Sequence, residues 1–207
     1  AGPPPEPMAI PAAALTSRKT RTVGDKVQLP RLYLAWLTPR HLAPGDATLD
    51  VLADILAGGK NSRLYKRLVY DMQIAQDVSA FQASAALSSS FMVIATARPG
   101  HSAEELQKVI DEEIAKLQSE PPTAHELERS LNQIEASFYN RLERVGGFSG
   151  KGDQLNAYYT ETGDPDWFNE DVARYRALSV SDIRAAAAEF LPLDKRVELT
   201  IVPEKKP

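Results

Sequence analysis

The 207-residue chain is long enough for one large domain or two small ones, and its composition, 43% hydrophobic and 25% charged, is that of an ordinary globular protein. Its formal net charge of −4, without a cluster of lysines or arginines, argues against nucleic acid as a partner. The absence of cysteine excludes disulfides, thiolate metal sites and cysteine catalysis, and no apolar run approaches the ~20 residues of a membrane span.

The beginning of the chain is rich in proline. Residues 1–14 read AGPPPEPMAIPAAA, which favours an extended, semi-rigid linker, with a disordered tail as the alternative. The sequence starts without an initiator methionine and without the charged and apolar regions of a signal peptide, so we expect a processed chain or a fragment of a longer protein. We predict a linker or tail over residues 1–15 and a single domain over residues 16–207.

Two strands are expected in residues 17–39, around a turn at Gly24-Asp25. In the second strand, neighbouring positions are apolar on both sides of the alternation, which predicts that both faces are buried. One side carries Leu32, Leu34 and Trp36, and the other carries Tyr33, Ala35 and Leu37.

Two helices are expected after these strands. Residues 45–59 have apolar side chains at helical spacing, with a capping candidate in Asp46 or Thr48 and a stop at Gly58-Gly59. Residues 61–71, NSRLYKRLVYD, predict a second helix. Two further runs, at residues 74–84 and 88–99, are typical of strands and predict a hairpin.

The central part of the chain predicts two long helices. Residues 102–120 begin with Ser102 and Glu105 in the spacing of a capping box, and the helix stops at Pro121-Pro122. Thr123 and Glu126 repeat the same spacing at the start of a long apolar stripe that runs to residue 142.

The start of that second helix, TAHELERSL at residues 123–131, also resembles a zinc motif. The motifs H-E-x-x-H and H-x-x-E-H both need a second histidine four residues after the first, one helical turn further along the helix. His125 begins both patterns, and both fail at Arg129, because a guanidinium has no lone pair to offer a cation. The sequence therefore predicts a capping box here, with His125 solvated.

The last third of the chain predicts short helices and one strand. The glycine-rich run RVGGFSGKGDQL at residues 144–155 is not a phosphate-binding loop, because that motif needs glycine at 145 and serine or threonine at 152. Helices are expected at residues 153–164, 165–178 and 180–191, the last capped by Ser179, and an alternating strand at residues 195–203. Segregated blocks of strands and helices predict an α+β fold, with a mainly antiparallel sheet packed against several helices.

No active site is visible in these elements. The three histidines, His41, His101 and His125, are far apart in separate loops or caps, and no serine lies in a G-x-S-x-G elbow. The paired carboxylates Glu112-Glu113 fall on a helix that is expected to be solvated. The residues alone therefore predict no catalytic residue and no metal ligand.

Several stretches resemble the C-terminal, non-catalytic domain of the pitrilysin/insulinase family of zinc peptidases, which includes mitochondrial processing peptidase. One of them is LDVLADILAGGKNSRLYKRLV at residues 49–69, and its GG-x-x-SRL pattern at residues 58–68 is the most specific part of the resemblance. The others are YLAWLTP (33–39), IAQDVSA (74–80), TAHELERSLNQIEASF (123–138) and LSVSDIRAAAAEFL (178–191). The resemblance covers residues 16–205.

The resemblance implies one of two duplicated α+β domains. In the family, the first domain carries H-x-x-E-H and a distal glutamate and binds zinc, and the second forms the other wall of a closed chamber for peptides. Residues 49–59, which correspond to the zinc helix, contain no histidine. The resemblance therefore implies that this chain alone is inactive, with zinc and catalysis supplied by another domain or subunit, and with peptide as the substrate.

The resemblance also assigns two candidate substrate-binding residues. Many family members have an arginine, and seven residues later a tyrosine, that hold the substrate backbone. Those positions here are Val69 and Gln76. Gln76 keeps a hydrogen-bond donor for a peptide, and Arg67, two residues before Val69, is the neighbour that would replace the missing guanidinium.

Two other functions remain open at this stage. A structural or assembly subunit derived from a peptidase is favoured by the loss of arginine at Val69. An independent peptide-binding module would need peptide affinity of its own. Because bacterial relatives are often periplasmic, the resemblance favours the periplasm, with the cytoplasm as the alternative.

Overall fold

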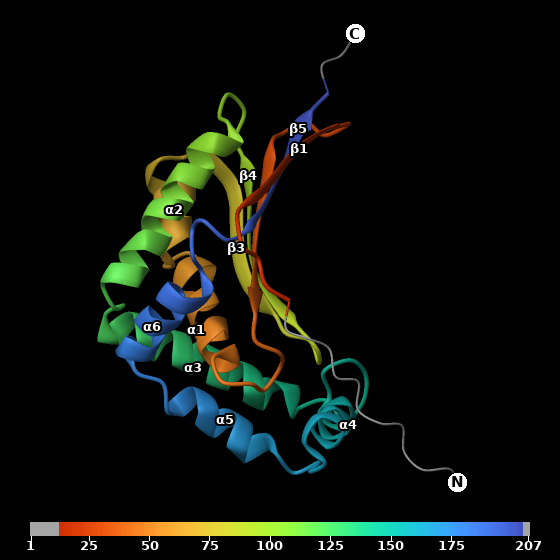
Figure 1. Ribbon diagram of the computed structural model, residues 1–207. Coiled ribbons are helices and arrows are strands. Elements are labelled where there is room, and N and C mark those ends of the chain that lie inside the picture. Colours follow the sequence, from red (N-terminus) through yellow and green to blue (C-terminus); the bar gives the residue numbers. More distant parts are fainter. Residues whose placement is uncertain (1–12, 205–207) are drawn as a thin grey trace.

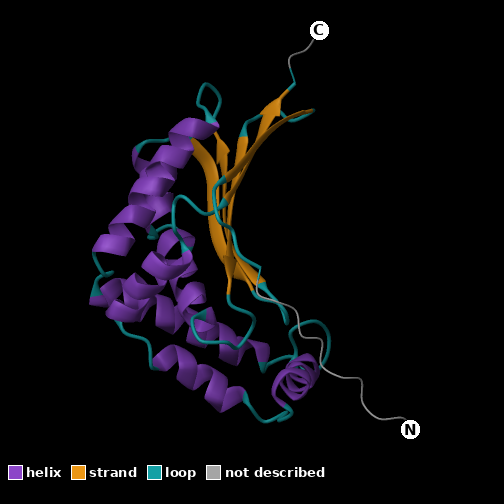
Figure 2. Cartoon of the chain, in the orientation of Figure 1, coloured by secondary structure: helices purple, strands orange, loops and turns teal. Residues whose placement is uncertain are grey.

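The computed structural model describes residues 13–204, which form a five-stranded sheet with helices on one face (Figures 1 and 2). The strand order is β1-β5-β2-β4-β3. The strands are β1 (Lys19–Asp25), β2 (Arg31–Thr38), β3 (Ala75–Ala83), β4 (Ser89–Ala97) and β5 (Val197–Pro203). The predicted linker or tail spans residues 1–15, and residues 1–12 of it lie outside the described residues.

The helices lie between and after these strands in the chain. They are α1 (Asp46–Ala57), the π-helix η1 (Tyr65–Asp71), α2 (Ala103–Ser119), α3 (Ala124–Arg141), α4 (Lys151–Thr162), α5 (Phe168–Arg176) and α6 (Val180–Phe190). β2 pairs antiparallel with β4 and β5, β3 pairs antiparallel with β4, and only the β1–β5 pair is parallel. The predicted α+β fold with a mainly antiparallel sheet is confirmed.

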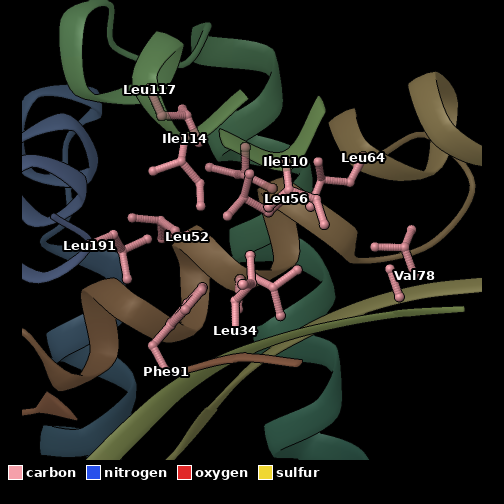
Figure 3. Close-up of a cluster of buried hydrophobic side chains, with 14 of the residues drawn as sticks. Leu34, Leu52, Leu56, Leu64, Val78, Phe91, Ile110, Ile114, Leu117 and Leu191 are labelled. Atoms are coloured by element: carbon pink, nitrogen blue, oxygen red, sulfur yellow. The ribbon is translucent and has the colours of Figure 1, made fainter. Parts of the chain in front are cut away.

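The core lies between the sheet and the helices (Figure 3). Leu34 and Phe91 reach it from the sheet, Leu52 and Leu56 from α1, and Ile110 from α2, and each is fully buried. Burial of such a side chain contributes about 1.5–3 kcal/mol. α1, which the resemblance aligns with a zinc helix, is therefore a core element in this chain.

The two strands predicted in residues 17–39 are present, but the predicted turn at Gly24-Asp25 is wrong. Gly24 and Asp25 belong to β1, so the chain turns only after Asp25, and β5 lies between β1 and β2 in the sheet. The prediction that both faces of β2 are buried is also wrong. Leu32, Leu34 and Trp36 are buried, whereas Leu37 on the opposite face is exposed, because the helices cover only one face of the sheet.

Two predictions about the helices need a local correction. The residues expected to form an α-helix at 61–71 wind as a π-helix over most of that range, with the Met72 N–H donating to the Arg67 carbonyl at 2.9 Å, five residues back. At the start of α1, neither Asp46 nor Thr48 caps the helix. Gly45 is the N-cap, without a side-chain cap bond, and Asp46 is instead buried in a polar network.

The three capping boxes are confirmed. Ser102, Thr123 and Ser179 each accept a hydrogen bond from the backbone N–H three residues later, and the acidic side chain at that position binds back to the cap. Within residues 13–204, no helix has the length and apolar composition needed to cross a bilayer.

Candidate functional site at the β3 edge

β3 is one of the two edge strands of the sheet, so one side of its backbone has no strand partner among the described residues. At its start the register with β4 shifts, since Ala75 pairs with Ala97 and Asp77 with Thr96. Gln76 is the extra residue of this β-bulge, and its side chain is exposed. An edge of this kind is where an extended peptide can add a strand.

Arg67 and Val69 lie on η1, and both are engaged by the domain itself. The Arg67 guanidinium donates to Glu113 Oε1 at 2.8 Å and to Glu112 Oε2 at 2.5 Å, which ties η1 to α2. Val69 packs against the core. Among the described hydrogen bonds, none joins Arg67 to Gln76, so the two candidates do not form one binding group. Their role toward a peptide stays a prediction.

The expectation that Glu112-Glu113 is solvated is wrong for Glu113. Its side chain is buried, whereas Glu112 is half-exposed beside it. The reason is the charge of Arg67, which approaches from η1 and compensates for the loss of water around the carboxylate. Nothing in the local pattern of α2 indicates this partner, which lies 46 residues away.

A hollow of about 360 Å³ lies beside the β3 edge, between α1, α3 and α5. Ala80, Phe81 and Gln82 line it in succession. Since neighbouring side chains of a strand point to opposite faces, three consecutive lining residues place the hollow along the edge of the strand. Its walls combine aromatic and charged groups, with Phe138 and Arg141 from α3.

A polar network lies beside this hollow, and Asp50, Ser84 and Tyr175 of the network line it. Tyr175 Oη donates to Asp50 Oδ2 at 2.7 Å, and burial of Asp50 raises the pKa of its carboxyl to about 6. Asp46, which is 1% exposed, accepts from Ser84 Oγ at 2.6 Å and pairs with Arg174 at 3.3 Å. The network therefore joins α1 to α5 and to the chain after β3.

The raised pKa of Asp50 predicts a pH-dependent stability. Because the folded-state pKa, about 6, lies above the ordinary value of 3.8, the carboxyl favours the folded state at low pH, and this contribution is lost as the pH rises from about 4 to about 6. The loss is of the order of 3 kcal/mol for a shift of this size. Asp50→Asn, followed by urea unfolding at pH 4 to 7, is expected to remove this part of the pH dependence.

Asp194→Asn is the matched control for this prediction, because Asp194 lies exposed in the turn before β5. It should leave the pH profile as in the unmodified chain. A profile that is unchanged by Asp50→Asn would show that the carboxyl does not titrate in this range.

The TAHELERSL segment has a structural role around Glu126. The Glu126 carboxylate completes the capping box of α3 and accepts two hydrogen bonds from Arg63, at 2.6 and 2.9 Å. The Arg63 guanidinium holds the pKa of Glu126 at about 2. His125 is exposed, as predicted. Within residues 13–204, no group of three or more histidine, aspartate or glutamate side chains is placed to hold a metal ion.

Residues 1–134 match the family model described as the peptidase M16 inactive domain. The chain belongs to this family. The predicted resemblance to the non-catalytic domain of these zinc peptidases is therefore confirmed. A comparison with curated proteins gave no match.

Solved structures share the fold of this M16 inactive domain. A protease from Helicobacter pylori is 26% identical with a TM-score of 0.83, over 95% of this chain and 48% of that one. The inactive peptidase domain of a protein described as a zinc protease, from Bordetella parapertussis, is 24% identical with a TM-score of 0.75, over 89% of this chain and 96% of that one. The periplasmic protease PqqL from Escherichia coli is 17% identical with a TM-score of 0.71, over 91% of this chain and 21% of that one.

The M16 inactive domain thus spans about half the length of the Helicobacter pylori protease and nearly all of the Bordetella parapertussis chain.

The polar network beside β3 was not predicted from the sequence. The sequence feature that could have indicated this network is the row Asp46, Asp50 and Asp54, which are spaced four residues apart on one side of an otherwise apolar helix.

Proposed function

We propose that this M16 inactive domain encloses and holds peptide substrates as the non-catalytic partner of a zinc-dependent endopeptidase, whose H-x-x-E-H helix lies on another domain or subunit. The observation that carries the proposal is the free edge of β3 with the hollow beside it. In the parent enzyme, bound zinc would activate the water that hydrolyses the peptide.

An extended peptide fits the chemistry of this edge. The β3 backbone offers unpaired N–H and C=O groups to the peptide main chain, and the hollow has room for a side chain. The exposed Gln76 amide, at the bulge, can donate and accept at the start of the strand. Arg67 would act indirectly, because its ion pairs with α2 hold η1 in place just before the start of β3.

A structural or assembly subunit derived from a peptidase is the second candidate. It is favoured by Val69, which packs against the core at a position where many family members have an arginine for the substrate, and by the engagement of Arg67 with α2. In this case the β3 edge would bind no peptide. Periplasmic localisation stays a prediction, supported by the name of one structural neighbour.

Reconstitution tests the two candidates. The zinc-binding polypeptide of the parent is assayed on quenched fluorescent peptides with and without this domain, and we expect the domain to raise kcat/KM by at least about tenfold, or about 1.4 kcal/mol. Phe81→Ala, at the hollow, should raise KM with little change in kcat, because it removes a contact that is made before chemistry.

Leu37→Ala is the matched control for Phe81→Ala, since Leu37 is similarly exposed but lies on β2, inside the sheet. It should leave both constants unchanged. If adding the domain leaves cleavage unchanged, the enclosing role is excluded and the structural role is favoured.

A further inference from the structure

The two faces of β3 have different surroundings. Val78 belongs to the core under the helices (Figure 3), and Gln82, on the same side, donates a hydrogen bond to α1. The alternate side chains, Asp77, Ser79 and Phe81, point to the other face of the sheet, which the helices leave open, and all three are exposed. A peptide strand added at the β3 edge would therefore have every second side chain beside these three residues.

Asp77 and Phe81 are four residues apart on this open face. Their partners on β4 are Thr96 and Met92, and Ser79 between them pairs with Ile94. Four residues of a strand span about 14 Å. A peptide that pairs with β3 has the same repeat, so the residue beside Asp77 and the residue beside Phe81 are also four positions apart in the peptide.

The Asp77 carboxylate has no cation of its own. Its Oδ1 accepts a hydrogen bond from Thr96 Oγ1 at 3.2 Å, and none of the ion pairs within residues 13–204 includes Asp77. Arg31, which pairs with Thr96 from β2, lies over the Tyr33 ring at 5.4 Å. Opposite charges on neighbouring strands attract, so a lysine or arginine of the peptide is favoured beside Asp77.

Phe81 offers an apolar contact at the other position. Its side chain is 39% exposed and also lines the hollow. The same cross-strand row continues over the sheet through Met92, Ala35 and Val197, which are all apolar. Since an aromatic side chain on a strand is stabilised by an aromatic or branched aliphatic neighbour, such a residue of the peptide is favoured beside Phe81.

We propose that Asp77 and Phe81 select the sequence of the peptide that this domain holds. The preferred peptides carry a lysine or arginine and, four residues from it, an aromatic or large aliphatic residue. This inference rests on the proposed function, because it places the peptide on the β3 edge. The free backbone of that edge would bind any extended peptide, whereas these two side chains discriminate between sequences.

Cleavage of quenched fluorescent peptides by the reconstituted enzyme, this domain together with the zinc-binding polypeptide, tests the selection. One set of peptides has lysine and phenylalanine four residues apart, in both orders, and a second set has glutamate in place of lysine. The unmodified domain should give a KM about three- to fivefold lower for the better lysine peptide than for its glutamate counterpart, with similar kcat. Asp77→Lys should reverse this preference.

Asp25→Lys is the matched control for Asp77→Lys. Asp25 is also an exposed aspartate on an edge strand, but it lies on β1, at the opposite edge of the sheet. This variant should keep the preference for lysine. Phe81→Ala should raise KM for peptides with phenylalanine and leave it unchanged for peptides with alanine at that position. Thermal unfolding of each variant shows whether the fold is intact.

The outcomes separate this inference from the proposed function. If Asp77→Lys keeps the preference for lysine, or if Asp25→Lys reverses it equally, Asp77 does not select the peptide and the inference is overturned, while the proposed function stands. If the unmodified domain changes the cleavage of none of the peptides, the proposed function fails and the inference fails with it.

Discussion

Arg196→Ala is expected to lower the free energy of unfolding by about 3–5 kcal/mol, the cost of breaking a buried ion pair from one side. Arg196 is fully buried just before β5. Its guanidinium donates to both carboxylate oxygens of Asp111 on α2, at 2.5 and 2.8 Å, and to Glu198 at 2.7 Å. Without the guanidinium, the buried Glu198 carboxylate loses its closest positive partner. Urea unfolding followed by circular dichroism measures the loss.

Two further variants, one with an exposed arginine removed and one double variant, test whether burial of the cation is the cause. Arg176→Ala also removes an arginine–carboxylate pair, with Glu135, but its side chain is 57% exposed, so solvent screens the pair and the cost should be much smaller than that of Arg196→Ala. Adding Glu198→Gln to Arg196→Ala should cost less than the sum of the single changes, because the two side chains share one network. Equal costs for Arg196→Ala and Arg176→Ala would show that burial of the cation does not matter.

The local features of the fold could be predicted from the sequence. A capping box depends on two residues three positions apart, so Ser102, Thr123 and Ser179 reveal their helix starts without any knowledge of the rest of the chain. The hairpin of β3 and β4 is likewise a contact between neighbours in sequence. These are also the elements that make the α+β class recognisable.

The strand order could not be predicted in the same way. β1 and β2 are adjacent in sequence, and an alternating pattern does not say which strand an edge will pair with. β5, from the other end of the chain, takes the place between them, and a hydrogen bond from Arg18 to the carbonyl of Leu193 spans 175 residues. Which face of β2 is buried depends on the helices that follow, so its all-apolar pattern gave the wrong prediction for Leu37.

The candidate site was predictable only in part, for the same reason. Gln76 and Arg67 were assigned through resemblance, which fixes a position but not its partners. The ion pairs of Arg67 with α2 and the hydrogen bond from Tyr175 to Asp50, across 125 residues, follow from tertiary packing. The acidic row on α1 is a local signal, but without α5 its role in the hollow cannot be known.

Trp36 is where the second large effect is expected, because this side chain joins the sheet, the helices and the segment before β5. It is 1% exposed, packs edge-on against Phe91, and lies under the Arg196 guanidinium at 5.5 Å. Its Nε1–H donates to the Pro192 carbonyl at 3.0 Å. Trp36→Ala should therefore lower the free energy of unfolding by about 3–5 kcal/mol, measured by urea unfolding.

The conservative variant divides this effect into two parts. Trp36→Phe keeps most of the aromatic packing and loses the donor to Pro192, so a cost of about 1–3 kcal/mol is expected. Leu37→Ala, the next residue on the exposed face of the same strand, should cost less than about 1 kcal/mol. If Trp36→Phe is as damaging as Trp36→Ala, the hydrogen bond that fixes the chain before β5 matters more than the core, and the position of β5 between β1 and β2 depends chiefly on that bond.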